Sequence, residues 1–360
     1  YLFPNGTGTG ARQYGDAGND HFAVLPTTTF AFLRWSGIYR DGAGVYRSAP
    51  ADPAASPMHN PLYYNPLVTY APWAPAQLST GAFTPLNATT TAAKSHPVRG
   101  TGTFDLTNAV ALNTNGNFVF TAFPGMRVPA GSRKSVCDGN NANCGAWTDV
   151  AADEAAAAGR VTRVAMPYYA ATYWVKEACN LPAVPNVATD SCAALPGGGT
   201  LKRYEIKNGN AFPSGRSYAA EMQNFANWFQ YYRKRRLMLS AAMGETMENL
   251  TGMRLGVVAF ANHAAVTMYD ADAVAATANR RRVAGFIYEV ANGSGTPTRQ
   301  TLKHIGEQYK RLDQTNGRYN VVQYACQRNN AFIVTDGFAN ASGVSVPAYD
   351  SGKSAATWGA

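Results

Sequence analysis

Two oxygen-bearing side chains stand where an α/β protein commonly binds its ligand. Asp336 directly follows the apolar run Phe332 to Val334, and Thr296 lies in the glycine-rich turn GSGTP before a predicted helix. In doubly wound sheets, ligands bind at the carboxyl ends of the strands, and a carboxylate with a hydroxyl suits magnesium or calcium. Aspartate before glycine is also common in ordinary turns, and threonine before proline is common as a helix cap. A purely structural role of both residues therefore stays open as the alternative to metal binding.

Four of the five cysteines form two local pairs in polar, turn-rich segments. Cys137 and Cys144 flank DGNNAN, and Cys179 and Cys192 flank NLPAVPNVATDS. Neither spacing is that of a zinc site, so we predict two short disulfide-closed loops, each stabilising the fold by roughly 2–3 kcal/mol. Disulfides imply an oxidising compartment. Cys326 is left over, and it is either a buried small residue before a strand or the partner of a group outside this chain.

Two basic runs and a group of aromatic residues permit contacts with a ligand. Residues 233–236 read RKRR and residues 280–282 read RRR. Nucleic acid or membrane phosphate could bind there, but a solvated helix face is the more common explanation of such runs. Similarly, Tyr63, Tyr64 and Trp73 could stack on sugars or bases, or they could pack a loop. Tyr70 belongs to the same group.

No motif for catalysis is present. The five histidines are scattered, and the sequence has no H-E-x-x-H, G-x-S-x-G or G-x-G-x-x-G. The segment DSGKS at 350–354 lacks the upstream glycine of a phosphate-binding loop, so we interpret it as a surface loop. We therefore expect a binding protein rather than an enzyme; a surface hydrolase would need an acid–base pair that the sequence does not indicate.

The amino-acid composition disfavours several classes of protein. Of the 360 residues, 46% are hydrophobic and only 15% are charged, which disfavours intrinsic disorder and coiled coil. The net charge of +9 is spread along the chain, which favours general attraction to acidic surfaces over a dedicated nucleic-acid site. No run of about 18 apolar residues occurs, so no membrane span is expected. Because the chain starts at Tyr1 without a leader, we expect it to be a piece of a longer product.

The elements that must position these residues fall into two regions. Residues 1–216 are rich in Gly, Pro, Thr, Asn and Tyr, with short β-branched or aromatic runs, which predicts a β-rich, loop-heavy region. Only residues 149–160, DVAADEAAAAGR, look helical there. Residues 217–360 have a different pattern of apolar and polar residues, and we predict a domain boundary between residues 216 and 217.

The second region predicts alternating helices and strands. An apolar stripe from Met222 to Leu250 predicts one long amphipathic helix with Ser217 as its N-cap, although Glu221 is one residue off a capping box. Residues 253–262 predict a buried parallel strand, 273–290 a second helix, and Pro297 the start of a third. A second buried strand follows in NNAFIVTDGFAN. This order is typical of a doubly wound α/β sheet.

The order of four motifs resembles a known family. NPLYYNPLVTYAPW (60–73), EMQNFANWFQYYRKRRLMLSAAMGE (221–245), GSGTPTRQTL (293–302) and CQRNNAFIVTDGFAN (326–340) resemble the N-terminal region of the PilY/PilC family of type IV pilus tip proteins. The resemblance implies a von Willebrand factor A domain, a Rossmann-like doubly wound sheet, with residues 1–216 as a large insertion. Thr296 and Asp336 would then be the second and third elements of its metal-ion-dependent adhesion site.

The first element of that site, D-x-S-x-S after the first strand, is absent before the predicted long helix. We expect it, together with the first strand, upstream of Tyr1. The sheet of this chain would then lack a central strand and leave unpaired edges on its neighbours. Another chain or segment would fill that slot.

The resemblance also implies a function. We expect a secreted bacterial cell-surface protein at the pilus tip, or fimbrium tip, that acts in cell adhesion and primes pilus assembly. Its partners would be minor pilins and a host or abiotic surface, with a magnesium or calcium ion as cofactor. The alternative is an extracellular receptor for nucleic acid or polysaccharide on the same scaffold.

Overall fold

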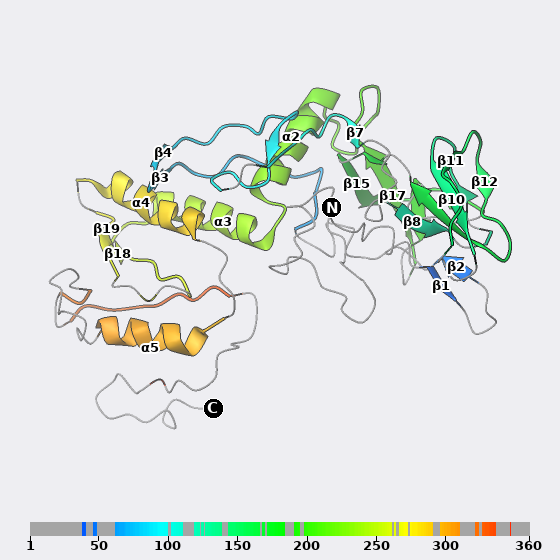
Figure 1. The fold of residues 1–360 in the computed structure, drawn as a ribbon. Helices are drawn as coiled ribbons and strands as arrows, with labels where there is room; N and C mark the ends of the chain where they lie inside the picture. Colours follow the sequence, from blue (N-terminus) through cyan, green and yellow to red (C-terminus); the bar gives the residue numbers. More distant parts are fainter. Residues whose placement is uncertain are drawn as a thin grey trace. The chain divides into compact units, whose positions relative to one another are not determined.

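Figure 1 shows the computed structural model of the chain. It divides into two compact units: Tyr1–Pro72 with Leu86–Leu239, and Trp73–Pro85 with Ser240–Ala360. The boundary predicted between residues 216 and 217 is a different one: it separates an inserted region from the von Willebrand A-like domain that would contain it. It stays a prediction. The structure describes residues 38–40, 46–48, 62–99, 102–110, 119–122, 124–125, 127–138, 143–165, 168–169, 171–183, 191–194, 198–260, 263, 266–272, 274–290, 296–309, 321–323, 326–335 and 346.

The first unit is built largely from short antiparallel strands, as predicted for residues 1–216. Its largest sheet has the strand order β11-β10-β13-β8, and a three-stranded sheet has the order β15-β17-β16. The other strands form two-stranded pairs. The strands are β1 Ile38–Arg40, β2 Tyr46–Ser48, β5 Ala93–Lys94, β6 Thr103–Phe104, β7 Ala109–Val110, β8 Val119–Ala122, β9 Arg127–Val128, β10 Arg133–Cys137, β11 Thr148–Asp149, β12 Glu154–Ala155, β13 Val161–Ala165, β14 Tyr168–Tyr169, β15 Thr172–Lys176, β16 Cys192–Ala194 and β17 Thr200–Glu205.

The predicted helix at residues 149–160 is wrong. This segment holds the last residue of β11 and all of β12 instead, and its backbone bonds to other segments. Val150 exchanges hydrogen bonds with Gly131 and Ser132, at 2.8 and 2.9 Å. The carbonyl of Ala156 accepts from the N–H of Gly125 at 2.9 Å. Tertiary pairing therefore overrides the helix propensity of the alanines, which is a weak preference.

The predicted long helix is two helices, α2 Tyr218–Tyr231 and α3 Arg235–Asn249. Ser217 is the N-cap of α2, as predicted, and its hydroxyl accepts from the N–H of Ala220. The break follows from Arg233, which is 0% exposed. Its N–H bonds to the carbonyl of Trp228 at 3.0 Å, one residue farther back than an α-helical bond, so the chain leaves the helix there.

The second unit contains the hairpin of β3 Ala76–Leu78 and β4 Gly81–Phe83, the pair β18 Arg254–Leu255 and β19 Tyr269–Asp270, and the helices α4 Ala276–Glu289 and α5 Thr298–Tyr309. Both helices lie where the sequence predicts them. Within the described residues, no helix has both the length and the run of apolar residues needed to span a membrane. The chain is therefore a mixed α/β protein with several small sheets.

The two predicted buried parallel strands are wrong for the residues that the structure describes. The first shrinks to β18, which pairs antiparallel with β19. The second, in residues 329–335, belongs to no sheet; it runs extended near α5 (Figure 1), where the hydroxyl of Tyr309 donates to the carbonyl of Asn330 at 2.6 Å. Phe332 is 84% exposed. A parallel strand becomes buried only when neighbouring strands and helices cover both of its faces.

The hairpin β3–β4 packs closely against α4. Gly285 makes this contact: an added Cβ would lie 1.9 Å from the carbonyl oxygen of Gln77. Nearby, the ring of Tyr288 lies 4.6 Å from that of Trp73 and 5.9 Å from that of Phe83. Glu289 accepts hydrogen bonds from the N–H and hydroxyl of Ser79. These contacts hold the hairpin to the C-terminal half of the helix.

We predict that Gly285→Ala destabilises the second unit by about 1–3 kcal/mol, because the methyl group must displace backbone rather than a side chain. Alanine has the higher helix propensity by about 1 kcal/mol, so the substitution would stabilise an unobstructed helix. Urea denaturation measures the difference. Ala278→Gly on the same helix is the control and should cost only about 1 kcal/mol. A stabilised Gly285→Ala variant would contradict the close contact.

Candidate functional site

The structure places only one of the two predicted metal ligands. Thr296 lies two residues before α5, half-buried, and its carbonyl accepts from the N–H of Thr298 at 2.8 Å. Asp336 lies outside the described residues, as does the DSGKS loop at 350–354. Among the described residues, no group of three or more His, Cys, Asp or Glu side chains could hold a metal ion. The site formed by Thr296 and Asp336 therefore stays a prediction.

The cysteine pairing is confirmed. Cys137 is bonded to Cys144 and Cys179 to Cys192, closing loops with sequence separations of 7 and 13. Cys326 is a free, exposed thiol. The interpretation of Cys326 as a buried small residue is therefore wrong, since its segment is not packed into a sheet.

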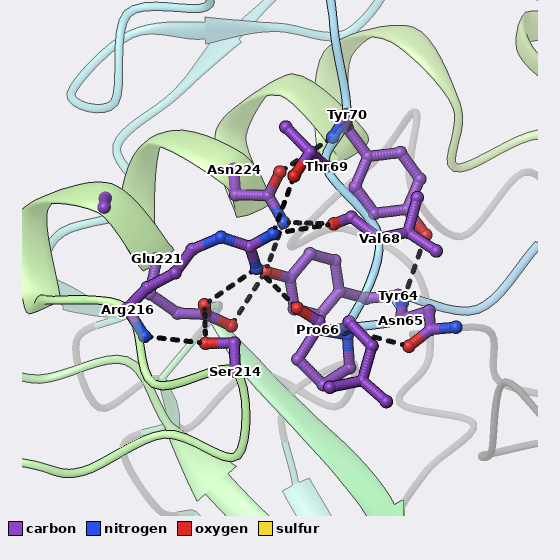
Figure 2. A network of polar contacts seen from close by, with 12 residues as sticks. Tyr64, Asn65, Pro66, Val68, Thr69, Tyr70, Ser214, Arg216, Glu221 and Asn224 are labelled. Carbon is purple, nitrogen blue, oxygen red and sulfur yellow. Dashed lines mark hydrogen bonds and ion pairs between the residues drawn. The ribbon is translucent and has the colours of Figure 1, made fainter.

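A buried carboxylate organises the contact between the motifs at residues 60–73 and 221–245 (Figure 2). Glu221 of α2 is 0% exposed. Its Oε1 accepts from the hydroxyl of Tyr64 at 2.8 Å, and its Oε2 accepts from the hydroxyl of Ser214 at 2.6 Å. Arg216 adds an ion pair of 3.3 Å to Oε2. Burying a charge is costly unless it is paired and hydrogen-bonded, and Glu221 has both kinds of partner.

Arg216 extends this network to the main chain of the first motif. Its Nη2 donates to the carbonyl of Val68 at 3.2 Å and to the hydroxyl of Thr69 at 2.9 Å, and Nη1 donates to the carbonyl of Pro66. One guanidinium thus joins a loop before α2 to a loop about 150 residues earlier in the chain. A lysine could not provide this planar set of donors.

Three amide side chains on one face of α2 bind the backbone of the preceding extended segment. Asn224, Asn227 and Gln230 recur every three residues, and all three are at least 90% buried. Each replaces the partner that an extended segment would otherwise find in a neighbouring strand. The bonds are Tyr70 N–H to Asn224 Oδ1 at 2.8 Å, Asn224 Nδ2 to the Val68 carbonyl at 2.8 Å, Asn227 Nδ2 to the Tyr70 carbonyl at 2.8 Å, Ala88 N–H to Asn227 Oδ1 at 2.9 Å, and Lys94 N–H to Gln230 Oε1 at 3.0 Å.

The aromatic residues of the first motif pack the core. This agrees with the interpretation that they pack a loop, which was the alternative to stacking on sugars or bases. Tyr63 and Tyr64 are 0% exposed, and Trp73 is 2% exposed. The ring of Tyr64 lies 5.6 Å from that of Trp228 and 5.1 Å from that of Phe225. Burial raises the pKa of the Tyr63 and Tyr64 hydroxyls, so both remain protonated; Tyr64 donates to Glu221, and Tyr63 accepts from the N–H of Trp174 at 3.1 Å.

The expectation that residues 233–236 form a solvated helix face is wrong for Arg233, which is 0% exposed, whereas Lys234, Arg235 and Arg236 are half-buried. The Arg233 guanidinium lies 4.0 Å from the centre of the Phe229 ring, and its Nη2 donates to the carbonyl of Ser95 at 2.7 Å. Burial lowers the pKa of Arg236 to about 10, with a smaller contribution from nearby Arg99. Arg233 therefore serves packing within the first unit.

His96 lies among these cations. Its Nδ1 accepts from the N–H groups of Val98 and Arg99, at 3.2 and 3.0 Å. Burial, together with the positive charges of Arg99, Arg236, Lys234 and Arg233, lowers the pKa of His96 to about 3. The ring is therefore neutral at physiological pH.

The second basic run divides its three arginines among different tasks. Arg280 donates to the carbonyls of Leu250 and Ala271, at 3.4 and 3.1 Å. Arg281 forms an ion pair with Glu248 at 3.2 Å. Arg282 is exposed and makes no hydrogen bond or ion pair to any described residue. The expectation of a solvated helix face therefore holds only for Arg282.

Comparison of the chain with protein-family models, with curated proteins and with solved structures found no match. The resemblance therefore depends on its motifs alone. Sequence reasoning missed Glu221, Arg216 and the amides of α2 as partners of the first motif. A signal was present, since three amides at three-residue spacing interrupt an apolar stripe where leucine or alanine would be usual.

We predict that Glu221→Gln destabilises the first unit by about 2–4 kcal/mol, because it leaves the Arg216 charge without its carboxylate and places an amide donor against hydroxyl donors. Urea denaturation followed by tryptophan fluorescence measures the change. Glu245→Gln on the exposed side of α3 is the matched control and should alter the free energy of unfolding by less than about 0.5 kcal/mol. Equal effects of the two substitutions would contradict the network.

We predict a pH-dependent loss of stability that arises from His96. Its pKa is lower in the folded chain than in the unfolded chain, so its contribution is complete above about pH 6.5 and declines as the pH falls towards 3. Between about pH 7.5 and about pH 5, the wild-type chain should lose about 2 kcal/mol through this group. His96→Asn keeps an acceptor for the two N–H groups and should remove that part of the loss. Identical pH profiles of the two chains would contradict the prediction.

Proposed function

We propose that this chain is the A-domain portion of a PilY-like type IV pilus tip protein, secreted to the bacterial cell surface. It acts in adhesion and primes or stabilises pilus assembly through minor pilins. Its mechanism is recognition: the A domain and its disulfide-closed insertion present a polar and aromatic surface to a pilin, a host or an abiotic partner.

The observation that carries the proposal is the contact between two motifs of the resemblance, residues 60–73 and residues 221–245. Tyr64 and Tyr70 of the first motif bond to Glu221, Asn224 and Asn227 of the second, more than 150 residues away. Residues from two of the motifs that carry the resemblance therefore act together in one buried network, which supports the proposal. Chance similarity of two separate segments would not require them to meet.

An unpaired apolar segment supports the A-domain part of the proposal. Phe332, Ile333 and Val334 are 84%, 36% and 40% exposed, although their sequence is that of a buried strand. We propose that a strand supplied by another segment or chain, followed by D-x-S-x-S, pairs with this segment and completes the metal site with Thr296 and Asp336. The two disulfides fit an oxidising, extracellular location.

Substitution of Asp336 in the full-length protein tests the function. We expect Asp336→Ala to reduce surface attachment and the number of assembled pili, because a carboxylate ligand of the cation is lost. Chelation of divalent cations should reduce attachment by wild-type cells and have no further effect on Asp336→Ala cells. Attachment assays and pilus counts by electron microscopy measure both.

Asp350→Ala is the matched control, since it removes an aspartate from a predicted loop outside the metal site. It should leave attachment and pilus number unchanged. The proposal fails if Asp336→Ala cells attach and assemble pili like wild-type cells, or if deletion of the whole protein has no effect on either.

A further inference from the structure

A groove lies between the hairpin β3–β4 and the N-terminal half of α4, in the second unit. Its volume is about 470 Å³, within the range of small-molecule sites. Its lining includes Phe83 and Thr84 from the hairpin side and Thr277, Arg281 and Arg282 from α4. We call it the arginine groove.

The arginine groove follows from the sequence of α4. At the C-terminal half of the helix, Gly285 admits the backbone of Gln77, and Glu289 holds Ser79, so the hairpin is in close contact. One turn earlier, the helix carries two long side chains, Arg281 and Arg282, in place of a glycine. These side chains cannot be covered by backbone in the same way, and a groove remains.

The charge of the groove is positive. Arg281 shares its charge with Glu248, which holds its Nε at 3.2 Å and leaves the terminal nitrogens of the guanidinium for other contacts. Arg282 has no carboxylate partner within the described residues. A guanidinium presents its donors in a plane that matches a carboxylate. The groove therefore suits a ligand that carries one or few negative charges.

The other residues that line the arginine groove determine which anionic ligands fit it. Phe83 is half-buried and is fixed edge to face against Tyr288, at 5.9 Å, so it offers a rigid apolar surface. Thr84 and Thr277 add hydroxyl groups, and the Thr277 hydroxyl, which accepts from the Nη2 of Arg280 at 3.4 Å, can still donate. A sugar ring with a carboxylate combines all three complements: a negative charge, hydroxyl groups and an apolar face of C–H groups. A glutamate side chain offers only the first of these, and nucleic acid needs a row of cations along its phosphates that two arginines do not provide.

We infer that the arginine groove binds an acidic sugar, a uronic acid residue of an extracellular polysaccharide. Arg282 holds the carboxylate, Arg281 and the threonine hydroxyls bind ring hydroxyls, and Phe83 contacts the apolar face of the ring. This inference depends on the groove alone and uses neither Thr296 nor Asp336. It can therefore hold or fail independently of the metal site and of the pilus-tip role.

Titration calorimetry on the whole chain with trigalacturonate tests the inference, with maltotriose as the uncharged counterpart. We expect saturable binding of trigalacturonate and none of maltotriose. Arg282→Gln should weaken binding roughly tenfold or more, as loss of a charge-assisted hydrogen bond does. Because Arg282 is exposed, circular dichroism of this variant should match the wild type. Arg299→Gln, an equal charge change at an exposed position of α5, should leave the affinity unchanged.

Three results would overturn the inference. The first is absence of trigalacturonate binding by the wild-type chain. The second is an equal loss in Arg282→Gln and Arg299→Gln, which would indicate general charge attraction instead of a site. The third is tighter binding of oligoglutamate or oligothymidylate than of trigalacturonate, with sensitivity to Arg282→Gln, which would assign the groove to a different class of ligand.

Discussion

Burial of the Glu221 carboxylate is the constraint on which the first unit depends. A carboxylate with no exposed surface must find donors inside the protein, and Glu221 finds them on Tyr64, Ser214 and Arg216. Arg216 in turn fixes the carbonyls of the extended segment that follows Tyr64. The amides of α2 continue the same principle along the helix. Around Val68 and Tyr70, this helix face thereby replaces a neighbouring strand, and that part of the segment keeps a defined path without belonging to a sheet.

In the second unit, a helix also holds an extended segment, but it does so mainly by close packing instead of buried charge. Gly285 removes a side chain so that the hairpin backbone can approach α4, and Tyr288 fills the adjoining space with an aromatic ring. The contact is limited in length, because the helix carries arginines one turn earlier. Tight packing at one end and an open, positively charged groove at the other are thus two results of the same stretch of sequence.

The arginines show why charge runs are difficult to interpret without coordinates. In the first unit, Arg233 is buried and Arg216 is half-buried, and both bond to main-chain carbonyls. Arg280 also bonds to carbonyls, while its second neighbour Arg282 is exposed. In the sequence, all four are simply arginines in polar or basic stretches. Whether such a side chain stabilises the fold or is available to a ligand depends on which carbonyls surround it, and that is decided by segments far away in the chain.

The sequence by itself determined the local features: the Ser217 cap, the positions of α4 and α5, the short strands of the first region and both disulfide pairs. Each depends on residues close together in the chain. The tertiary structure decided the rest. Residues 149–160 form strands because distant backbone pairs with them, α2 ends where Arg233 turns inward, and Phe332 to Val334 stay exposed because an apolar run becomes a buried strand only when a neighbour is present. Local preference amounts to less than about 1 kcal/mol per residue, and burial or pairing with a distant segment outweighs it.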